Sequence, residues 1–292
     1  MPELTVNNFN LVHTLECGQI FRVRKIVENP PFFGRDDWYY INTRDRFFKV
    51  RQKGNKLEFY GVEEDFLIHF FSLDEPFEQI LTEINKDKHI NAAISRYHGL
   101  RLIRQDPWEC LISFICSPAS NIGKIKSTLA QLSEYFGRRV ALDGVESYAF
   151  PEPGRINNYA KVKKSGAGFR TRYIIEANKN GVAWRGTRPV DGSSFVRVLR
   201  TLPYEQAKKE LKSISGVGDK VANCVLLFSL GFTEAFPVDV WIKKIMQELY
   251  FQNQVVPNRI IEDFAHNYFG KYAGYAQQYL YHYRRTLSQK LA

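Results

Sequence analysis

The first hundred residues show the alternation that short, half-buried strands produce. Three runs rich in aromatic and β-branched side chains occupy 38–41, 47–50 and 56–60. Turn-forming residues separate them at 42–45 and 52–55. Such runs, bounded by Asn, Asp and Gly, predict an antiparallel meander.

Further along the chain, apolar residues recur every three or four positions, as on one face of a helix. A first helix is predicted over 76–86, and Asp106 followed by Pro107 is typical of a helix start. Further helices are predicted over 123–136, 170–180, 204–213, 220–230, 240–250, 258–268 and 274–287, with a loop over 185–194. The predicted fold class is α+β: an antiparallel sheet domain over 1–99 and an α-helical body over 100–292.

Composition narrows the class of partner. The 292 residues are 44% hydrophobic and carry a net charge of +10, which favours a polyanion, nucleic acid before an anionic membrane surface. No apolar run reaches membrane-spanning length and the first residues lack a signal peptide, so an intracellular protein is expected. The four cysteines form no CxxC pair, which fits neither a zinc site nor a disulfide framework.

The most informative segment is 211–222, where Gly216-Val217-Gly218 joins two predicted helices. Glycines allow close backbone approach, and a helix start offers unpaired N–H groups to a phosphate. Gly216, Val217, Gly218 and Val221 are therefore candidate DNA-backbone contacts. An ordinary helix–helix corner with a glycine cap is the alternative. The downstream Pro237-Val238-Asp239, which opens the next helix, favours the DNA-binding interpretation.

The segment 211–244 resembles the helix-hairpin-helix and Gly/Pro-Asp signature of the endonuclease III superfamily. Four further stretches, at 15–22, 104–117, 168–173 and 272–277, resemble the 8-oxoguanine DNA glycosylase family in the family's order. This resemblance spans nearly the whole chain. It implies a bifunctional base-excision repair enzyme that flips a damaged base out of duplex DNA and then acts as an AP lyase.

The resemblance assigns the chemistry to two residues. Lys220 matches the nucleophile that attacks C1′, forms a Schiff base and promotes β-elimination. Asp239 matches the carboxylate that stabilises positive charge on the sugar. Outside the family context, Lys220 could be a phosphate contact, and Asp239 could be an N-cap, a role compatible with catalysis.

Four residues match the family's base pocket. The backbone carbonyl of Gly18 would accept the N7–H that distinguishes 8-oxoguanine from guanine. Gln277 would recognise the Watson–Crick edge, while Tyr281 and Cys224 would cover the two faces of the base. Tyr281 stands where the family usually has Phe, which retains the aromatic face.

The positions that face the opposite strand depart from the family pattern. Asn121, Lys124, Phe169 and Arg170 are the candidate DNA contacts, but Lys124 replaces an Arg and Phe169 replaces a Tyr. Ala119 replaces an Asn and cannot form its hydrogen bonds. Lesion recognition is therefore expected to persist, with a relaxed preference for opposite cytosine.

No cofactor and no metal are expected. No iron–sulfur cluster is expected either, because the family's cluster-bearing relatives carry four closely spaced cysteines near the C-terminus and this sequence has no cysteine beyond Cys224. The expected partner is double-stranded DNA containing oxidised guanine, bound by a monomer. Two alternatives stay open: a non-catalytic helix-hairpin-helix DNA-binding protein, and a glycosylase for a different damaged purine. Alkylated-base glycosylases share the hairpin and the Asp but generally lack the lysine, so Lys220 argues against assigning this chain to that class.

Overall fold

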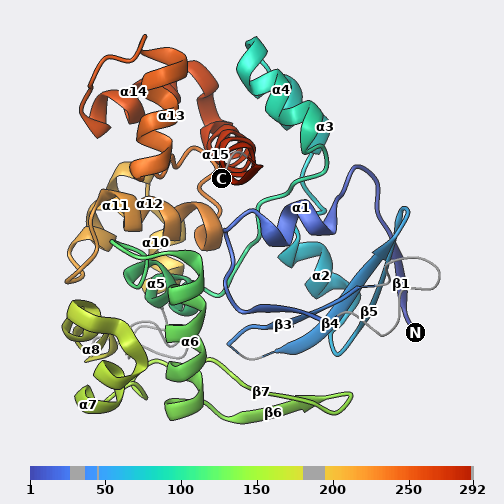
Figure 1. Ribbon diagram of the computed structural model, residues 1–292, viewed down its shortest axis with the longest axis vertical. Coiled ribbons are helices and arrows are strands. Elements are labelled where there is room, and N and C mark those ends of the chain that lie inside the picture. The colour runs from blue at the N-terminus through green and yellow to red at the C-terminus, as the bar shows by residue number, and fades with distance from the viewer. Residues whose placement is uncertain (27–36, 45, 180–194, 291–292) are drawn as a thin grey trace.

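The computed structural model describes residues 1–26, 37–44, 46–179 and 195–290 and has the predicted α+β architecture (Figure 1). A five-stranded sheet forms one side of the molecule, and helices with one two-stranded hairpin form the rest. The predicted loop over 185–194 lies outside the described residues. Within the described residues, no helix has the length and apolar character needed to span a membrane.

The sheet has the strand order β1-β5-β4-β3-β2, and each neighbouring pair is antiparallel. Its strands are β1 (Glu3–Thr5), β2 (Val23–Ile26), β3 (Trp38–Asn42), β4 (Phe47–Lys53) and β5 (Lys56–Tyr60). The predicted meander is β3–β4–β5, which is confirmed. The edge strands β1 and β2 were not predicted, because three or four residues are too few to show an alternation.

The sheet has its own apolar core. Helices α1 (Leu11–Glu16) and α2 (Glu64–Phe70) bury side chains against strand residues such as Ile41, Phe48 and Phe59. The ring of Phe48 meets those of Phe66 and Phe70 edge-on, at 5.6 Å in each case. This core holds the loop between α1 and β2, which carries Gly18, at the boundary with the helical body.

The helical body follows the predicted periodicity closely. Its helices are α3 (Phe77–Ile84), α4 (Lys88–Arg96), α5 (Pro107–Ile115), α6 (Ile122–Phe136), α7 (Tyr159–Val162), α8 (Thr171–Lys179), α10 (Phe195–Thr201), α11 (Tyr204–Lys212), α12 (Asp219–Val225), α13 (Val240–Tyr250), α14 (Asn258–Phe269) and α15 (Ala273–Lys290). Asp106 caps α5 by accepting from the backbone N–H of Glu109 at 2.9 Å, as predicted. The hairpin of β6 (Arg139–Leu142) and β7 (Val145–Tyr148) was not predicted, and neither were the short helices α1, α2, α4, α7 and α10.

One predicted helix is interrupted. The segment 220–230 forms α12 and then a turn of π-helix over Leu226–Leu230, which ends at Gly231 with φ +87°. The wider turn follows a nearly continuous apolar run, in which burial rather than amphipathic spacing sets the backbone. Its end is fixed because glycine accepts the left-handed conformation at no steric cost.

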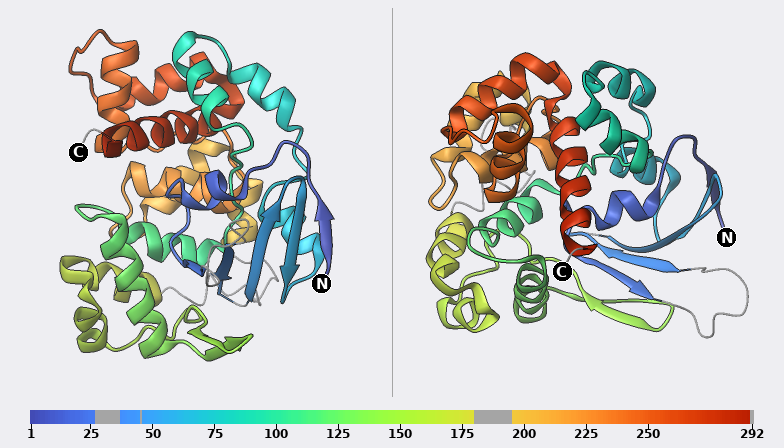
Figure 2. Two further views of the ribbon diagram at one scale, coloured as in Figure 1. Left: turned by 45° about the vertical axis from the view of Figure 1, so that its right-hand side comes forward. Right: turned by 45° about the horizontal axis from the view of Figure 1, so that its top comes forward.

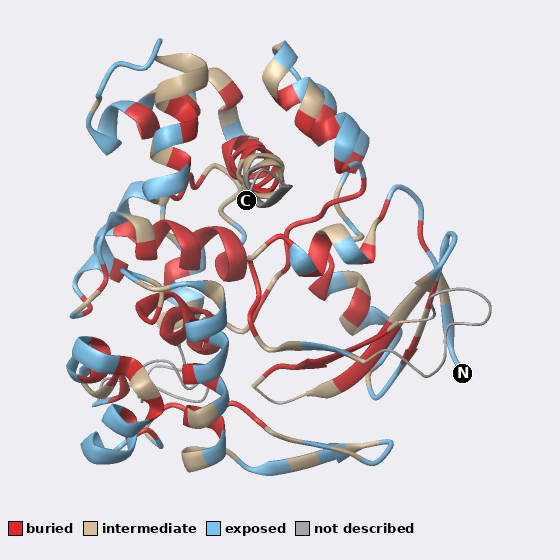
Figure 3. Cartoon of the chain, viewed as in Figure 1, coloured by how far each residue is buried: buried red, intermediate tan, exposed pale blue. Residues whose placement is uncertain are grey.

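Helix α15 runs through the middle of the molecule (Figures 1 and 2). The rings of Tyr275 and Tyr279 are fully buried, so most of its predicted aromatic stripe is core packing. Buried residues concentrate on α15, α5 and α12 (Figure 3). Side chains of α3 and α4 belong to this same core, so the division of the chain at residue 99 stays a prediction.

Candidate active site

The hairpin between α11 and α12 has the geometry of a backbone-binding turn. Gly216 has φ +85°, and a Cβ there would lie 2.5 Å from Cγ of Tyr173. Gly218 is the exposed, extended N-cap of α12, and no side chain caps that helix. The first N–H groups of α12 therefore lack a side-chain partner, which suits a phosphate oxygen.

The side chain of Lys220 is partly buried and held in one direction. Its Nζ donates to Oγ of Ser117 at 2.8 Å and lies 4.9 Å from the ring centroid of Phe114. The Ser117 hydroxyl donates to the carbonyl of Phe114 at 2.7 Å, which leaves its oxygen free to accept from the lysine. The amine is thus fixed beside the end of α5 rather than free in solvent.

Asp239 caps α13, as the sequence allowed. Its Oδ1 accepts from the backbone N–H of Ile242 at 2.8 Å. Burial raises the pKa of Cys224 to about 11, with Lys220 opposing that rise and Asp239 adding to it. Burial also raises the pKa of Tyr281, again with help from Asp239. The charges of Lys220 and Asp239 therefore both influence the buried Cys224 thiol, which stays protonated at neutral pH.

The Gly18 loop is held rigidly. Gly18 has φ +92°, a conformation that glycine adopts without strain. The buried side chain of Gln19 donates to the carbonyls of Thr14 and Arg101 at 2.9 and 2.8 Å. Its Oε1 accepts from the N–H of Ile103 at 2.9 Å. These bonds fix the backbone of the loop against the segment 101–103, which lies before α5 in the chain.

Helix α15 brings two predicted base-binding residues to this loop. A Cβ on Gly18 would lie 3.5 Å from Cε1 of Tyr281. The buried Gln277 donates through Nε2 to the carbonyl of Pro237 at 3.3 Å. Its Oε1 is buried without a hydrogen-bond partner among the described residues. The structure therefore brings Gly18 and Tyr281 together, and it links Gln277 to the turn that leads into Asp239.

The predicted contacts to the opposite strand occupy a second region, where α6 and α8 begin. Asn121 caps α6 by accepting from the N–H of Lys124 at 2.9 Å. Phe169 is 59% exposed, and the Arg170 guanidinium lies 4.5 Å from its ring centroid. Arg170 itself is buried and donates to the carbonyl of Ala119 at 3.0 Å. Contacts of these residues with DNA stay predictions.

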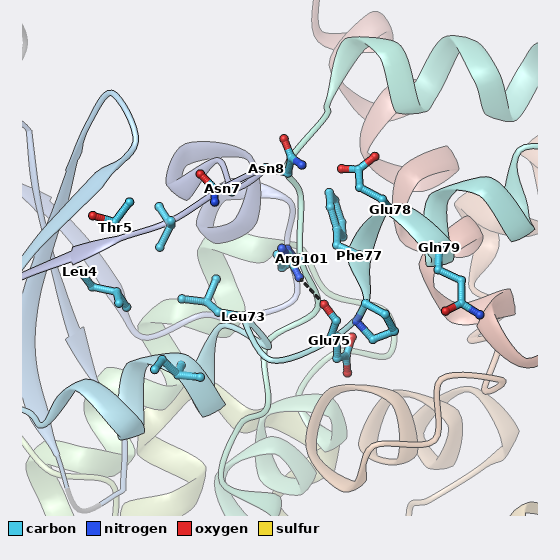
Figure 4. A pocket seen from close by; sticks show the side chains of 13 residues that line it. Leu4, Thr5, Asn7, Asn8, Leu73, Glu75, Phe77, Glu78, Gln79 and Arg101 are labelled. Atoms are coloured by element: carbon cyan, nitrogen blue, oxygen red, sulfur yellow. Dashed lines mark hydrogen bonds between the residues drawn. The ribbon is translucent and has the colours of Figure 1, made fainter.

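A cavity of about 540 Å³ lies elsewhere, where β1 approaches the start of α3 (Figure 4). Arg101 extends between Phe77 and Glu75, donating to the Glu75 carbonyl at 3.5 Å. Two further cavities adjoin α4 and the β6–β7 hairpin. None of the three is lined by Lys220 or Asp239, so they lie apart from the catalytic candidates.

Two residues of the site had no role assigned from the sequence. Ser117 lies in a motif that matched the family, but nothing local indicated a bond to a lysine 103 positions away. Arg285 resembles any basic residue near a helix end, yet its Nη1 lies 2.9 Å from the Cβ position at Gly18. Contacts of such sequence separation have no signature in a local pattern.

The fold and site together define a class of protein. A hairpin suited to a phosphate carries a lysine at the start of its second helix, and an aspartate caps the helix that follows. This combination is typical of helix-hairpin-helix DNA glycosylases.

Comparison with known proteins defines the family. Residues 3–111 match the family model described as the 8-oxoguanine DNA glycosylase N-terminal domain. The chain is 30% identical to the Arabidopsis thaliana N-glycosylase/DNA lyase OGG1, covering 96% of this chain and 78% of that protein. It is 28% identical to a probable N-glycosylase/DNA lyase of Methanothermobacter thermautotrophicus, over 74% and 73% of the two chains. The chain belongs to the 8-oxoguanine DNA glycosylase family.

Solved structures agree with this assignment. The chain superposes on MBOgg1, solved with a low affinity DNA ligand, with a TM-score of 0.87 and 32% identity over 98% of this chain and 96% of that chain. It also superposes on the Clostridium acetobutylicum 8-oxoguanine glycosylase/lyase bound to duplex DNA with cytosine opposite 8-oxoG. That TM-score is 0.85, with 30% identity over 97% of this chain and 94% of that chain. A 3-methyladenine DNA glycosylase of Archaeoglobus fulgidus, 18% identical, shares the fold.

Proposed function

We propose that this protein is a bifunctional base-excision repair enzyme that removes 8-oxoguanine from double-stranded DNA and then cleaves the abasic strand. The observation that carries the proposal is the fixed amine of Lys220, 2.8 Å from Ser117 Oγ at the start of the hairpin's second helix. A turn that binds the phosphate beside a flipped nucleotide would hold this amine next to the sugar of the same nucleotide.

The chemistry requires a neutral amine on Lys220. Its lone pair attacks C1′ as the bond to the base nitrogen breaks, and the base leaves with the bonding electron pair. Loss of a proton from the nitrogen and opening of the sugar ring give a Schiff base. Removal of a C2′ proton then expels the 3′ phosphate by β-elimination. The carboxylate of Asp239 stabilises the positive charge that grows on the sugar.

Base recognition would use groups that the fold already fixes. The Gly18 carbonyl would accept the N7–H of 8-oxoguanine and repel the N7 lone pair of guanine. The unpartnered Oε1 of Gln277 would accept an N–H from the Watson–Crick edge, which would satisfy a buried acceptor. Tyr281 and Cys224 would cover the two faces of the base.

The DNA strand would be bound by the backbone of Gly216, Val217 and Gly218, with Val221 packed behind it. We propose that the protein acts as a monomer on intracellular DNA. We propose no iron–sulfur cluster, because the four cysteines are widely spaced along the sequence.

Replacement of Lys220 by Gln tests this function. Lys220→Gln removes the nucleophile but retains a polar side chain of similar length. Base release and the borohydride-trapped covalent complex should both be lost, while binding to a lesion duplex persists. A trapped complex in the variant would show that another residue is the nucleophile. Trapping by the unmodified protein separates the enzyme from a non-catalytic DNA-binding protein, and a panel of damaged purines identifies the lesion.

Asp239→Asn is the matched variant for the second catalytic group. Asparagine caps helices as well as aspartate does, so the thermal midpoint should hardly change. Loss of the charge should lower the single-turnover rate of base release by roughly 10²–10³-fold, the effect of removing one stabilising group from a transition state. A normal rate would reduce Asp239 to a helix cap.

A further inference from the structure

Arg285 lies on α15 one helical turn beyond Tyr281, so the two side chains share a face of the helix. The Arg285 Cζ is 5.8 Å from the Tyr281 ring centroid. Its Nη1 is 2.9 Å from the position that a Cβ on Gly18 would take. The guanidinium therefore lies directly against the two residues that we assign to the base pocket.

The hydrogen bonds of Arg285 leave donors to spare. Nη2 donates to the carbonyl of Glu16, and the guanidinium also forms a hydrogen bond with the Tyr281 hydroxyl. A guanidinium has five N–H donors, and Nε is buried without a partner among the described residues. Nη1 of the same guanidinium is the atom nearest to the Cβ position of Gly18. Buried donors normally find partners, so donors left over beside a pocket indicate that a ligand supplies an acceptor.

The electrostatic effect of Arg285 extends across this end of the pocket. Burial raises the pKa of Cys17 to about 11, and Arg285 opposes that rise. Burial and, to a smaller extent, the charge of Arg285 lower the pKa of His282 to about 3, so His282 is neutral at physiological pH. Arg285 therefore contributes a fixed positive charge beside Gly18.

We propose that Arg285 is a further specificity-determining residue, whose guanidinium donates an N–H to the oxygen on C8 of the lesion. This inference rests on the assignment of Gly18 and Tyr281 to the base pocket. An 8-oxopurine presents a donor, N7–H, next to an acceptor, the C8 oxygen. The Gly18 carbonyl and an Arg285 N–H form the complementary acceptor–donor pair. Guanine offers a lone pair at N7 and only C–H at C8, so it satisfies neither in this register.

The test is single-turnover excision from two duplexes that differ in one atom. One contains 8-oxoguanine, and the other contains 8-thioguanine, in which sulfur, a poor acceptor, replaces the C8 oxygen while N7–H remains. Arg285→Met retains side-chain length and removes charge and donors. It should lower excision of 8-oxoguanine roughly 10- to 100-fold, the effect of one charge-assisted hydrogen bond. Excision of 8-thioguanine should hardly change, so the preference for oxygen over sulfur should collapse.

Two controls distinguish recognition from folding. Cleavage of a duplex that already contains an abasic site needs no base recognition and should be unaffected in Arg285→Met. Arg284→Met changes the neighbouring arginine, which pairs with Glu248 at 2.6 Å, and should retain both activities. Equal losses on the two lesions would make Arg285 a clamp for the Gly18 loop and overturn the inference. If the unmodified protein does not excise 8-oxoguanine, the proposed function fails, and the inference with it.

Discussion

Ala119 adopts a left-handed backbone, with φ +49°, in the loop before α6. This conformation is strained for alanine but readily adopted by asparagine. Arg170 fixes this loop by donating hydrogen bonds to the carbonyls of Pro118 and Ala119. A backbone shape that suits asparagine is therefore present without the amide that would contact an opposite base.

The prediction at this scale concerns the base opposite the lesion. Because Ala119 has no polar side chain and Lys124 lacks a planar fork, excision should differ by less than about tenfold among the four opposite bases. Ala119→Asn should raise the preference for cytosine, since one good base contact contributes about 1–3 kcal/mol of discrimination. The free energy of unfolding of this variant should not fall, because asparagine tolerates the left-handed backbone at position 119. Single-turnover rates on four duplexes, one for each opposite base, measure this preference. A strong preference for cytosine in the unmodified protein would contradict the prediction.

At the scale of single elements, Gly216 and Gly218 have different structural roles in the hairpin between α11 and α12. Gly216 has a positive φ and packs against the Tyr173 ring, whereas a Cβ on Gly218 would meet nothing within 4 Å. The first glycine is required by the fold, and the second leaves space in front of the α12 amide groups. Sequence alone gave both the same interpretation, because the ring that contacts Gly216 comes from α8.

Two alanine variants separate these roles. Gly216→Ala should lower the free energy of unfolding by about 1–3 kcal/mol through backbone strain and overlap with Tyr173. Gly218→Ala should cost less than about 1 kcal/mol, the difference between glycine and alanine as N-caps. It should nevertheless weaken DNA binding, because its methyl group occupies the approach to the phosphate. Urea unfolding and DNA titration measure the two effects, and full affinity in Gly218→Ala would refute the phosphate contact.

At the scale of the whole molecule, a buried ion pair joins the sheet to the helical body. Arg22, just before β2, lies 3.3 Å from the Glu109 carboxylate of α5 and also donates to the carbonyl of Tyr148 in β7. Burial raises the pKa of Glu109 to about 7, an effect that Arg22 opposes. Its Oε2 is buried without a hydrogen-bond partner among the described residues. The folded protein therefore binds a proton at Glu109 more tightly than the unfolded chain does.

The consequence is a pH-dependent stability. Because the pKa of Glu109 is about 7 in the folded protein and 4.5 in its unperturbed state, the unfolding free energy should fall as pH rises between these values. The loss is about 1.4 kcal/mol per pH unit, roughly 3 kcal/mol in all. Glu109→Gln should remove this slope. Urea unfolding from pH 4 to pH 8 measures it, and an equal slope in the two proteins would show that Glu109 is not its source.

Local signals determined much of this molecule. Asp106 and Asp239 have the residue types that cap helices, and both cap the helices that the sequence predicted. The three aromatic strands and the Gly-Val-Gly turn were also evident, because caps, turns and periodicity depend on residues close together in the chain. Apart from the predicted helix over 220–230, whose second half is a π-helix, the ends of the predicted helices differ from the structure by at most three residues.

The tertiary structure alone decided what depends on distant contacts. It paired the short edge strands, whose few residues show no alternation, and it placed α3 and α4 on α15. It brought Lys220 to Ser117, and Arg285 to Gly18 across more than two-thirds of the chain. A local pattern specifies which face of an element is apolar, but the partner of that face is chosen by packing of the whole core.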